Sequence, residues 1–125
     1  MLLLVDEPEV LATTCLILER SGFETAKAAE GRRALELARE ARAAGKPFSA
    51  ALLDLTVKGG LGGGDIIADL RREEPRLPVV ACTGYITPGL EKDLLKQGFT
   101  ALLPKPFTGR TLGRLLASVL AETGD

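Results

Sequence analysis

Residues 48–55 read FSAALLDL, a nearly continuous apolar run that ends with Asp54 and one further leucine. Apolar and polar residues do not alternate along this run, so it predicts a β-strand that is covered on both faces. Strands of this kind belong to parallel sheets with helices packed on each side. Five glycines follow between residues 59 and 64. We interpret this glycine-rich loop as open, with room beside Asp54 for another molecule.

Outward from this run, apolar strand-like segments alternate with segments of helical periodicity. The predicted strands cover residues 2–5, 23–28, 48–55, 77–84 and 101–107, and the predicted helices cover 8–22, 30–45, 64–74, 88–98 and 108–122. Asp65 and Thr108 are candidate N-caps of the third and fifth helices. Five strand–helix units predict an α/β fold with a five-stranded, doubly wound parallel sheet of flavodoxin-like type. The half-polar segment 23–28 is expected at an edge of that sheet.

Size and composition limit the classes of function. The chain has 125 residues, of which 46% are hydrophobic, and we expect residues 1–125 to form one domain. A net charge of −1 gives no basic surface for nucleic acid, and no apolar stretch is long enough for membrane insertion. Cys15 and Cys82 lie in apolar contexts and there is no histidine, which favours two reduced thiols in a cytoplasmic protein over a disulfide or zinc site.

Chemically informative side chains follow the strands, at the sheet edge where open α/β folds bind ligands. They are Asp6, Glu7, Asp54, Thr83 and Lys105. Three carboxylates close together repel one another, and one lysine offsets only part of that repulsion. A hard divalent cation with oxygen ligands, Mg²⁺ or Mn²⁺, would offset the rest, and the backbone carbonyl of Thr56 is a candidate further ligand.

The same side chains suit a phosphoryl group. A cation, an ammonium and a hydroxyl stabilise phosphoryl oxygens, and a carboxylate can itself become an acyl phosphate. Asp54 is the best candidate nucleophile because it ends the central predicted strand. We therefore expect Asp54 to be a phosphoryl acceptor, with Thr83 and Lys105 binding the phosphoryl oxygens.

Four motifs carry a family resemblance. They are LLLVDEPEV (2–10), ALLDLTV (51–57), VVACTGY (79–85) and LLPKPF (102–107), each at a strand end. Together they resemble the receiver domain of two-component response regulators over essentially the whole chain. The piece LDLTVKGGLGGGD (53–65) is most similar to receiver domains of hybrid sensor histidine kinases.

The resemblance implies a role for each of these residues. Asp6 and Glu7 would hold Mg²⁺ together with Asp54 and the Thr56 carbonyl. Asp54 would accept the phosphoryl group from a phosphohistidine, Thr83 would bind that group and move inward, and Lys105 would pair with Asp54. The Lys105–Pro106 peptide bond is expected to be cis.

The resemblance also implies partners and a location. The donor would be a histidine kinase or a histidine phosphotransfer domain, and phosphorylation would switch a binding surface. The domain would not be an enzyme, apart from slow self-phosphorylation from small donors and self-dephosphorylation. It would be cytoplasmic, alone or as the cytosolic part of a membrane-bound sensor kinase, and the last helix–strand–helix face could form a homodimer.

Three departures from the family pattern leave alternatives open. The acidic loop VDEPE is one residue short, Lys58 stands where proline is common, and Leu102 stands where many receivers carry an aromatic switch residue. Output could instead run through Tyr85 and the loop 84–89.

One alternative is a receiver-like binding module that takes no phosphate. A small aspartyl-phosphate phosphatase would need a second acid at residue 56, and a flavodoxin-like carrier would need a less acidic first loop.

Overall fold

A computed structural model describes residues 1–123 and contains one five-stranded parallel sheet in the order β2-β1-β3-β4-β5. The strands are β1 (Leu2–Leu4), β2 (Ala26–Ala28), β3 (Ala51–Asp54), β4 (Val79–Thr83) and β5 (Ala101–Pro104). The helices are α1 (Pro8–Arg20), α2 (Gly31–Ala43), α3 (Gly63–Glu73), α4 (Leu90–Gln97) and α5 (Gly109–Thr123). The predicted fold class is confirmed, and the half-polar second strand lies at an edge, as predicted.

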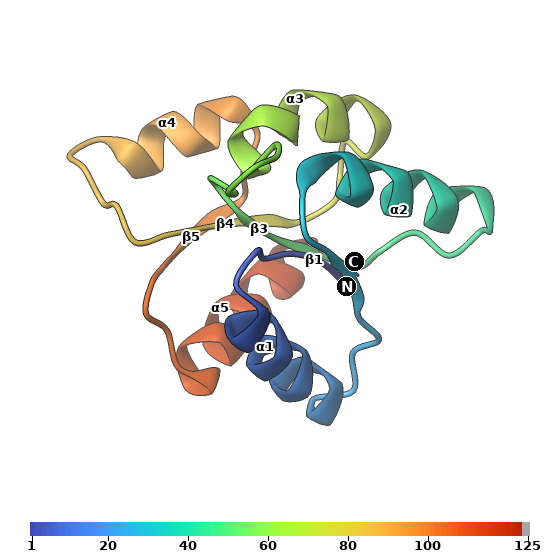
Figure 1. Ribbon diagram of the computed structural model, residues 1–125, viewed down its shortest axis with the longest axis horizontal. Coiled ribbons are helices and arrows are strands. Elements are labelled where there is room, and N and C mark those ends of the chain that lie inside the picture. Colours follow the sequence, from blue (N-terminus) through green and yellow to red (C-terminus); the bar gives the residue numbers. More distant parts are fainter. Residues whose placement is uncertain (124–125) are drawn as a thin grey trace.

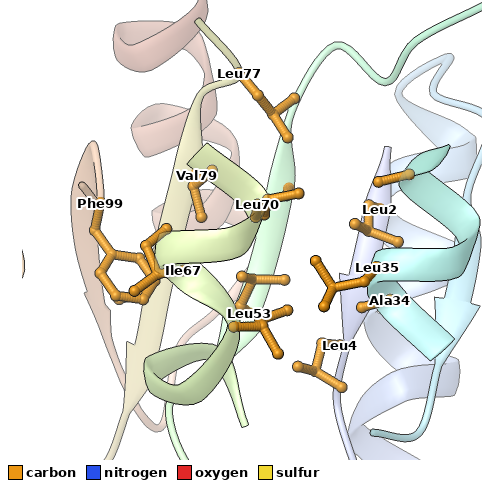
Figure 2. Packing of buried hydrophobic residues seen from close by; sticks show 14 of the residues in the cluster. Leu2, Leu4, Ala34, Leu35, Leu53, Ile67, Leu70, Leu77, Val79 and Phe99 are labelled. Carbon is orange, nitrogen blue, oxygen red and sulfur yellow. The ribbon is translucent and has the colours of Figure 1, made fainter. Parts of the chain in front are cut away.

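Helices cover both faces of the sheet, with α1 and α5 on one side and α2, α3 and α4 on the other (Figure 1). Successive strand residues enter opposite cores: Leu53 packs with α2 and α3, while Leu52 packs with α1 and α5. Figure 2 shows Leu35 of α2 and Leu70 of α3 directed toward Leu2 and Leu53 of the sheet. The run at 48–55 lacks alternation because both of its faces are buried.

Several predicted boundaries are wrong by a few residues. The strand predicted over 48–55 covers only Ala51–Asp54, because its pairing with β4 begins at Ala51 opposite Val79. Asp65 is not the N-cap of α3, because the helix begins earlier with Gly62 in that position. The Asp65 carboxylate instead accepts a hydrogen bond from the Gly62 amide at 2.9 Å, which still satisfies one free N–H at the start of the helix.

The N-cap prediction for the last helix is confirmed. The Thr108 hydroxyl accepts a hydrogen bond from the Thr111 amide at 3.2 Å, and the Thr108 carbonyl accepts one from the Leu112 amide at 3.0 Å. These bonds begin α5 one residue after the threonine, as the sequence predicts.

The interpretation of the glycine-rich loop as open is wrong for its second half. A Cβ atom at Gly62 would lie 2.3 Å from the Leu55 carbonyl oxygen, and one at Gly63 would lie 2.8 Å from the Leu53 Cβ. The Leu61 carbonyl accepts a 2.6 Å hydrogen bond from the Gly31 amide at the start of α2. These glycines therefore bring the loop close to β3 and α2, and they do not leave free space there.

Arg71 of α3 connects several elements at the end of the sheet where β4 and β5 begin, opposite to the end that carries Asp54. Its guanidinium donates to the Gly98 carbonyl at 2.7 Å and to the Leu77 carbonyl at 2.5 Å. It also donates to the Glu74 carbonyl at 3.0 Å and to the Thr100 hydroxyl at 3.3 Å. These acceptors lie at the ends of α3 and α4 and before β4 and β5, so one side chain connects four elements.

Replacing Arg71 should therefore destabilise the fold although the residue is far from the carboxyl edge. Arg71→Met keeps an unbranched apolar side chain but leaves part-buried carbonyls without a donor, at a cost of about 2 kcal/mol. Among the residues that the structure describes, the neighbouring Arg72 pairs only with Asp69, on the exposed surface, so Arg72→Met should change stability by less than about 0.5 kcal/mol. Urea unfolding of both variants measures the difference, and equal stabilities would contradict this role for Arg71.

Candidate functional site

The carboxyl ends of β1, β3, β4 and β5 surround a cavity of about 970 Å³. Its lining includes most of the predicted site residues, namely Asp6, Glu7, Asp54, Thr56, Thr83, Tyr85 and Lys105, and also Glu9, Lys58 and Cys82, but not the predicted Leu102 or Pro106. Asp54 is the last residue of β3, the central strand, and Thr83 is the last residue of β4 beside it. Parallel pairing places these strand ends at one edge of the sheet, so residues distant in sequence share one cavity.

Asp54 is a buried carboxylate with an unusual set of contacts. The residue is 1% exposed, and its Oδ1 lies 2.9 Å from the Lys105 ammonium. Across residues 1–123, neither carboxylate oxygen accepts a hydrogen bond of regular geometry. Buried polar atoms normally have such partners, so the Asp54 oxygens have unused capacity to bind a cation or to react.

The two members of this ion pair have altered pKa values. Burial raises the pKa of Asp54, the Lys105 ammonium opposes that effect, and the nearby Asp6 charge adds to it. Burial alone would lower the pKa of Lys105, but the contacts with Asp54 and Glu7 raise it above its usual value. Lys105 therefore remains charged, while the ionised form of Asp54 is disfavoured by its surroundings.

Asp6 and Glu7 occupy different positions. The Asp6 Oδ2 accepts a hydrogen bond from the Lys58 amide at 2.9 Å, and its charge acts on Asp54. Glu7 precedes Pro8, the first residue of α1, and its exposed carboxylate lies 3.3 Å from the Lys105 ammonium. No group of three or more acidic, cysteine or histidine side chains placed to hold a metal occurs among residues 1–123. The structure therefore does not group the predicted acidic ligands as a set of three.

The remaining donor set still fits a magnesium ion. Mg²⁺ in proteins commonly binds one or two carboxylates and keeps several waters. Asp54 has both carboxylate oxygens without regular hydrogen bonds, and Asp6 and Thr56 line the same cavity. Glu7, in contrast, is directed to Lys105.

Thr83 is linked to the loop that follows β4. Its hydroxyl accepts a hydrogen bond from the Tyr85 amide at 3.1 Å. The Tyr85 residue is 87% exposed, whereas Leu102 of β5 is half-buried and packs against the core on the α4 side. The Lys105–Pro106 peptide bond is cis.

Sequence reasoning did not assign Cys82 or Lys58 to the site. Cys82 pairs with Asp54 in the register of β3 and β4, so the two residues lie side by side. Burial and the Asp54 charge raise the pKa of Cys82 to about 12, so this thiol stays protonated. Both Cys15 and Cys82 are free and buried, as predicted. Cys82 directly precedes the predicted site residue Thr83, and this position was the signal for it in the sequence. Only the parallel register of β3 and β4 shows that Cys82 lies opposite Asp54.

The arrangement of acid, lysine and hydroxyl at three strand ends agrees with a known family. The family model of the response regulator receiver domain matches residues 1–117. The chain belongs to this family. It is a receiver domain of the two-component type, as the four motifs predict.

Relatives of this receiver include whole regulators and a sensor protein. An NtrX-like response regulator of Rickettsia bellii is 29% identical over 116 residues, which are 92% of this chain and 23% of that protein. Sensor protein TorS of Escherichia coli K12 is 26% identical over 120 residues, which are 96% of this chain and 13% of that protein. This receiver thus spans less than a quarter of the length of either protein.

A solved structure has the same architecture. The chemotaxis protein CheY4 of Vibrio cholerae superposes with a TM-score of 0.85 at 26% identity, covering 95% of this chain and 96% of that one. In residues 1–123 of this receiver, no helix is both long and apolar enough to cross a membrane.

Proposed function

We propose that this receiver accepts a phosphoryl group on Asp54 from a phosphohistidine and thereby changes a binding surface. The observation that supports this proposal best is the state of Asp54. It is a buried carboxylate at the end of the central strand, 2.9 Å from one ammonium, and its oxygens accept no regular hydrogen bond from residues 1–123. Such a carboxylate has an oxygen available for attack on phosphorus.

The transfer forms one bond and breaks one. An Asp54 carboxylate oxygen attacks phosphorus, and the bond between phosphorus and the imidazole nitrogen of the donor breaks. The electron pair stays on that nitrogen, and the product is an acyl phosphate on Asp54. Lys105, already beside Asp54, stabilises the negative phosphoryl oxygens, and the Thr83 hydroxyl can donate to one of them.

Asp6, Asp54 and the Thr56 carbonyl are the residues that would hold Mg²⁺. When bound, the ion would neutralise charge on the carboxylates and on the phosphoryl oxygens. Glu7 would then serve to hold Lys105 from the solvent side, since its carboxylate contacts that ammonium. This set differs from the one implied by family resemblance, in which Glu7 is a ligand.

The output is proposed to run from Thr83 to Tyr85. The Tyr85 amide donates a hydrogen bond to the Thr83 hydroxyl. An inward movement of Thr83 toward a phosphoryl group would therefore break this hydrogen bond or move Tyr85 as well. Tyr85 is exposed and available to a partner, whereas the half-buried Leu102 cannot make the aromatic movement found in many receivers. The proposed partners are a histidine kinase or a histidine phosphotransfer domain, and the proposed location of this receiver is the cytoplasm. A homodimer through α4, β5 and α5 is proposed as a further state.

Intact-mass spectrometry after incubation with acetyl phosphate and Mg²⁺ tests this function. We expect uptake of one phosphoryl group that hydroxylamine removes, because an acyl phosphate reacts with that nucleophile. Chelation of Mg²⁺ by EDTA should prevent the uptake. A chain that takes up no phosphate under these conditions would contradict the proposal and favour the alternative of a binding module, in which Asp54 has only a structural role.

A further inference from the structure

The cavity around Asp54 carries more negative than positive side chains. Its acidic lining residues are Asp6, Glu7, Glu9 and Asp54, and its basic ones are Lys58 and Lys105. Lys105 is already engaged, at 2.9 Å from Asp54 and 3.3 Å from Glu7. Lys58 forms no ion pair with any residue that the structure describes. An anion that enters this cavity therefore meets an acidic lining with one unengaged ammonium.

The backbone of Lys58 fixes where this residue lies. Its amide donates a 2.9 Å hydrogen bond to the Asp6 carboxylate, which holds the loop after β3 against the loop after β1. A proline at this position could not donate that bond. Residue 58 is therefore held beside Asp6, and this exposed residue belongs to the lining of the cavity.

We propose that Lys58 determines donor specificity by attracting doubly charged phosphoryl donors into the cavity. This inference rests on the proposed function of Asp54. Even with Mg²⁺ held by Asp6 and Asp54, Glu7 and Glu9 remain in the cavity lining, and their repulsion of a donor grows with the charge that the donor carries. The Lys58 ammonium opposes this repulsion at the entrance, before Lys105 contacts the phosphoryl oxygens. Its contribution therefore scales with donor charge, which a purely structural role would not produce.

Two small donors of different charge measure this scaling. Acetyl phosphate is a dianion at pH 7 and releases acetate when its bridging P–O bond breaks. Phosphoramidate is mainly a monoanion at pH 7 and releases ammonia when its P–N bond breaks. Lys58→Gln should lower the second-order rate of uptake about threefold for phosphoramidate and about ninefold for acetyl phosphate, since the loss applies once per unit of donor charge. Both reductions should shrink at high salt.

Two matched variants distinguish an effect of the Lys58 charge from an effect of Lys58 on the local structure. Lys58→Arg keeps the charge and should retain the wild-type ratio of the two rates. Lys46→Gln makes the same change in net charge in the exposed loop between α2 and β3, at the opposite edge of the sheet, and should leave both rates unchanged. The rates are taken from intact-mass measurements on quenched samples at fixed Mg²⁺ and fixed ionic strength.

Three other outcomes would contradict these proposals. If Lys58→Gln lowers both rates by the same factor, the residue acts through the position of Asp6, and donor recognition by charge is wrong. Unchanged rates would also overturn it. A wild-type chain that takes up phosphate from neither donor would overturn the proposed function itself, and this inference with it.

Discussion

The Asp54→Asn variant is expected to lose phosphoryl uptake and to unfold at a higher temperature than the wild type. The loss follows because the amide oxygen is a poor nucleophile toward phosphorus. The gain follows because burial disfavours the charged form of Asp54 more than Lys105 favours it, which is why its pKa is raised. Asparagine removes that buried charge, and its amide oxygen can accept a hydrogen bond from Lys105. A variant that is inactive but more stable cannot owe its inactivity to misfolding.

The stability gain should depend on pH. At a pH well below the ordinary Asp value of 3.8, Asp54 is protonated in both the folded and unfolded states, and its ionisation contributes nothing. As pH rises past that value, the unfolded chain loses the proton first, because the folded-state pKa is higher. The wild type is therefore destabilised progressively until the pH passes the folded-state pKa. Melting temperatures of both proteins, measured in EDTA from pH 3 to pH 8, should diverge over this interval and then run parallel.

The control is the same chemical change at an exposed aspartate. Asp69 lies on α3 and pairs with Arg72 at the surface, so Asp69→Asn should retain full uptake and a nearly unchanged melting temperature. Wild-type stoichiometry of phosphate in Asp54→Asn would show that another residue is the acceptor. A lower melting temperature for Asp54→Asn at pH 7 would show that the Lys105 ion pair outweighs the cost of burial.

The sequence predicts the sheet and its helices well because their causes are local. Strands such as 51–54 are continuous apolar runs, and helices show apolar residues at helical spacing with caps such as Thr108. The strand ends then place Asp54, Thr83 and Lys105 at one edge by topology alone. The prediction that these three residues line one cavity therefore needed only the usual strand order of parallel α/β sheets.

Tertiary contacts decide what the sequence could not predict. The acids of VDEPE are adjacent in sequence, but the turn into α1 directs Glu7 to Lys105 while Asp6 is held by the Lys58 amide. Asp65 has the composition of an N-cap, yet close packing of the preceding glycines lets α3 begin earlier. Lys58 differs from the family pattern in the sequence, but only the structure shows that its amide, which a proline would lack, donates a hydrogen bond to Asp6.

The glycines after Asp54 lead to the largest predicted loss of stability, in Gly62→Ala. The added Cβ would lie 2.3 Å from the Leu55 carbonyl oxygen and 2.8 Å from the Thr56 Cα. Both contacts are with backbone, so a side-chain rotation cannot relieve them and the loop must move. We expect a loss of about 3 kcal/mol or more in the free energy of unfolding, at the upper end of overpacking effects. The melting temperature should fall by about 10 °C for a chain of this length.

Gly64→Ala supplies the matched control, two residues further along. A Cβ there would lie 3.6 Å from the Leu55 carbonyl oxygen, an ordinary contact, and residue 64 belongs to the first turn of α3. Alanine favours the helix over glycine, so this variant should gain about 0.5–1 kcal/mol. Because Leu55 and Thr56 follow Asp54 directly, the folded fraction of Gly62→Ala should also take up phosphate more slowly. Equal stability of the two variants would mean that the loop is as open as its glycine content suggests. Its close contact with β3 would then not position Asp54.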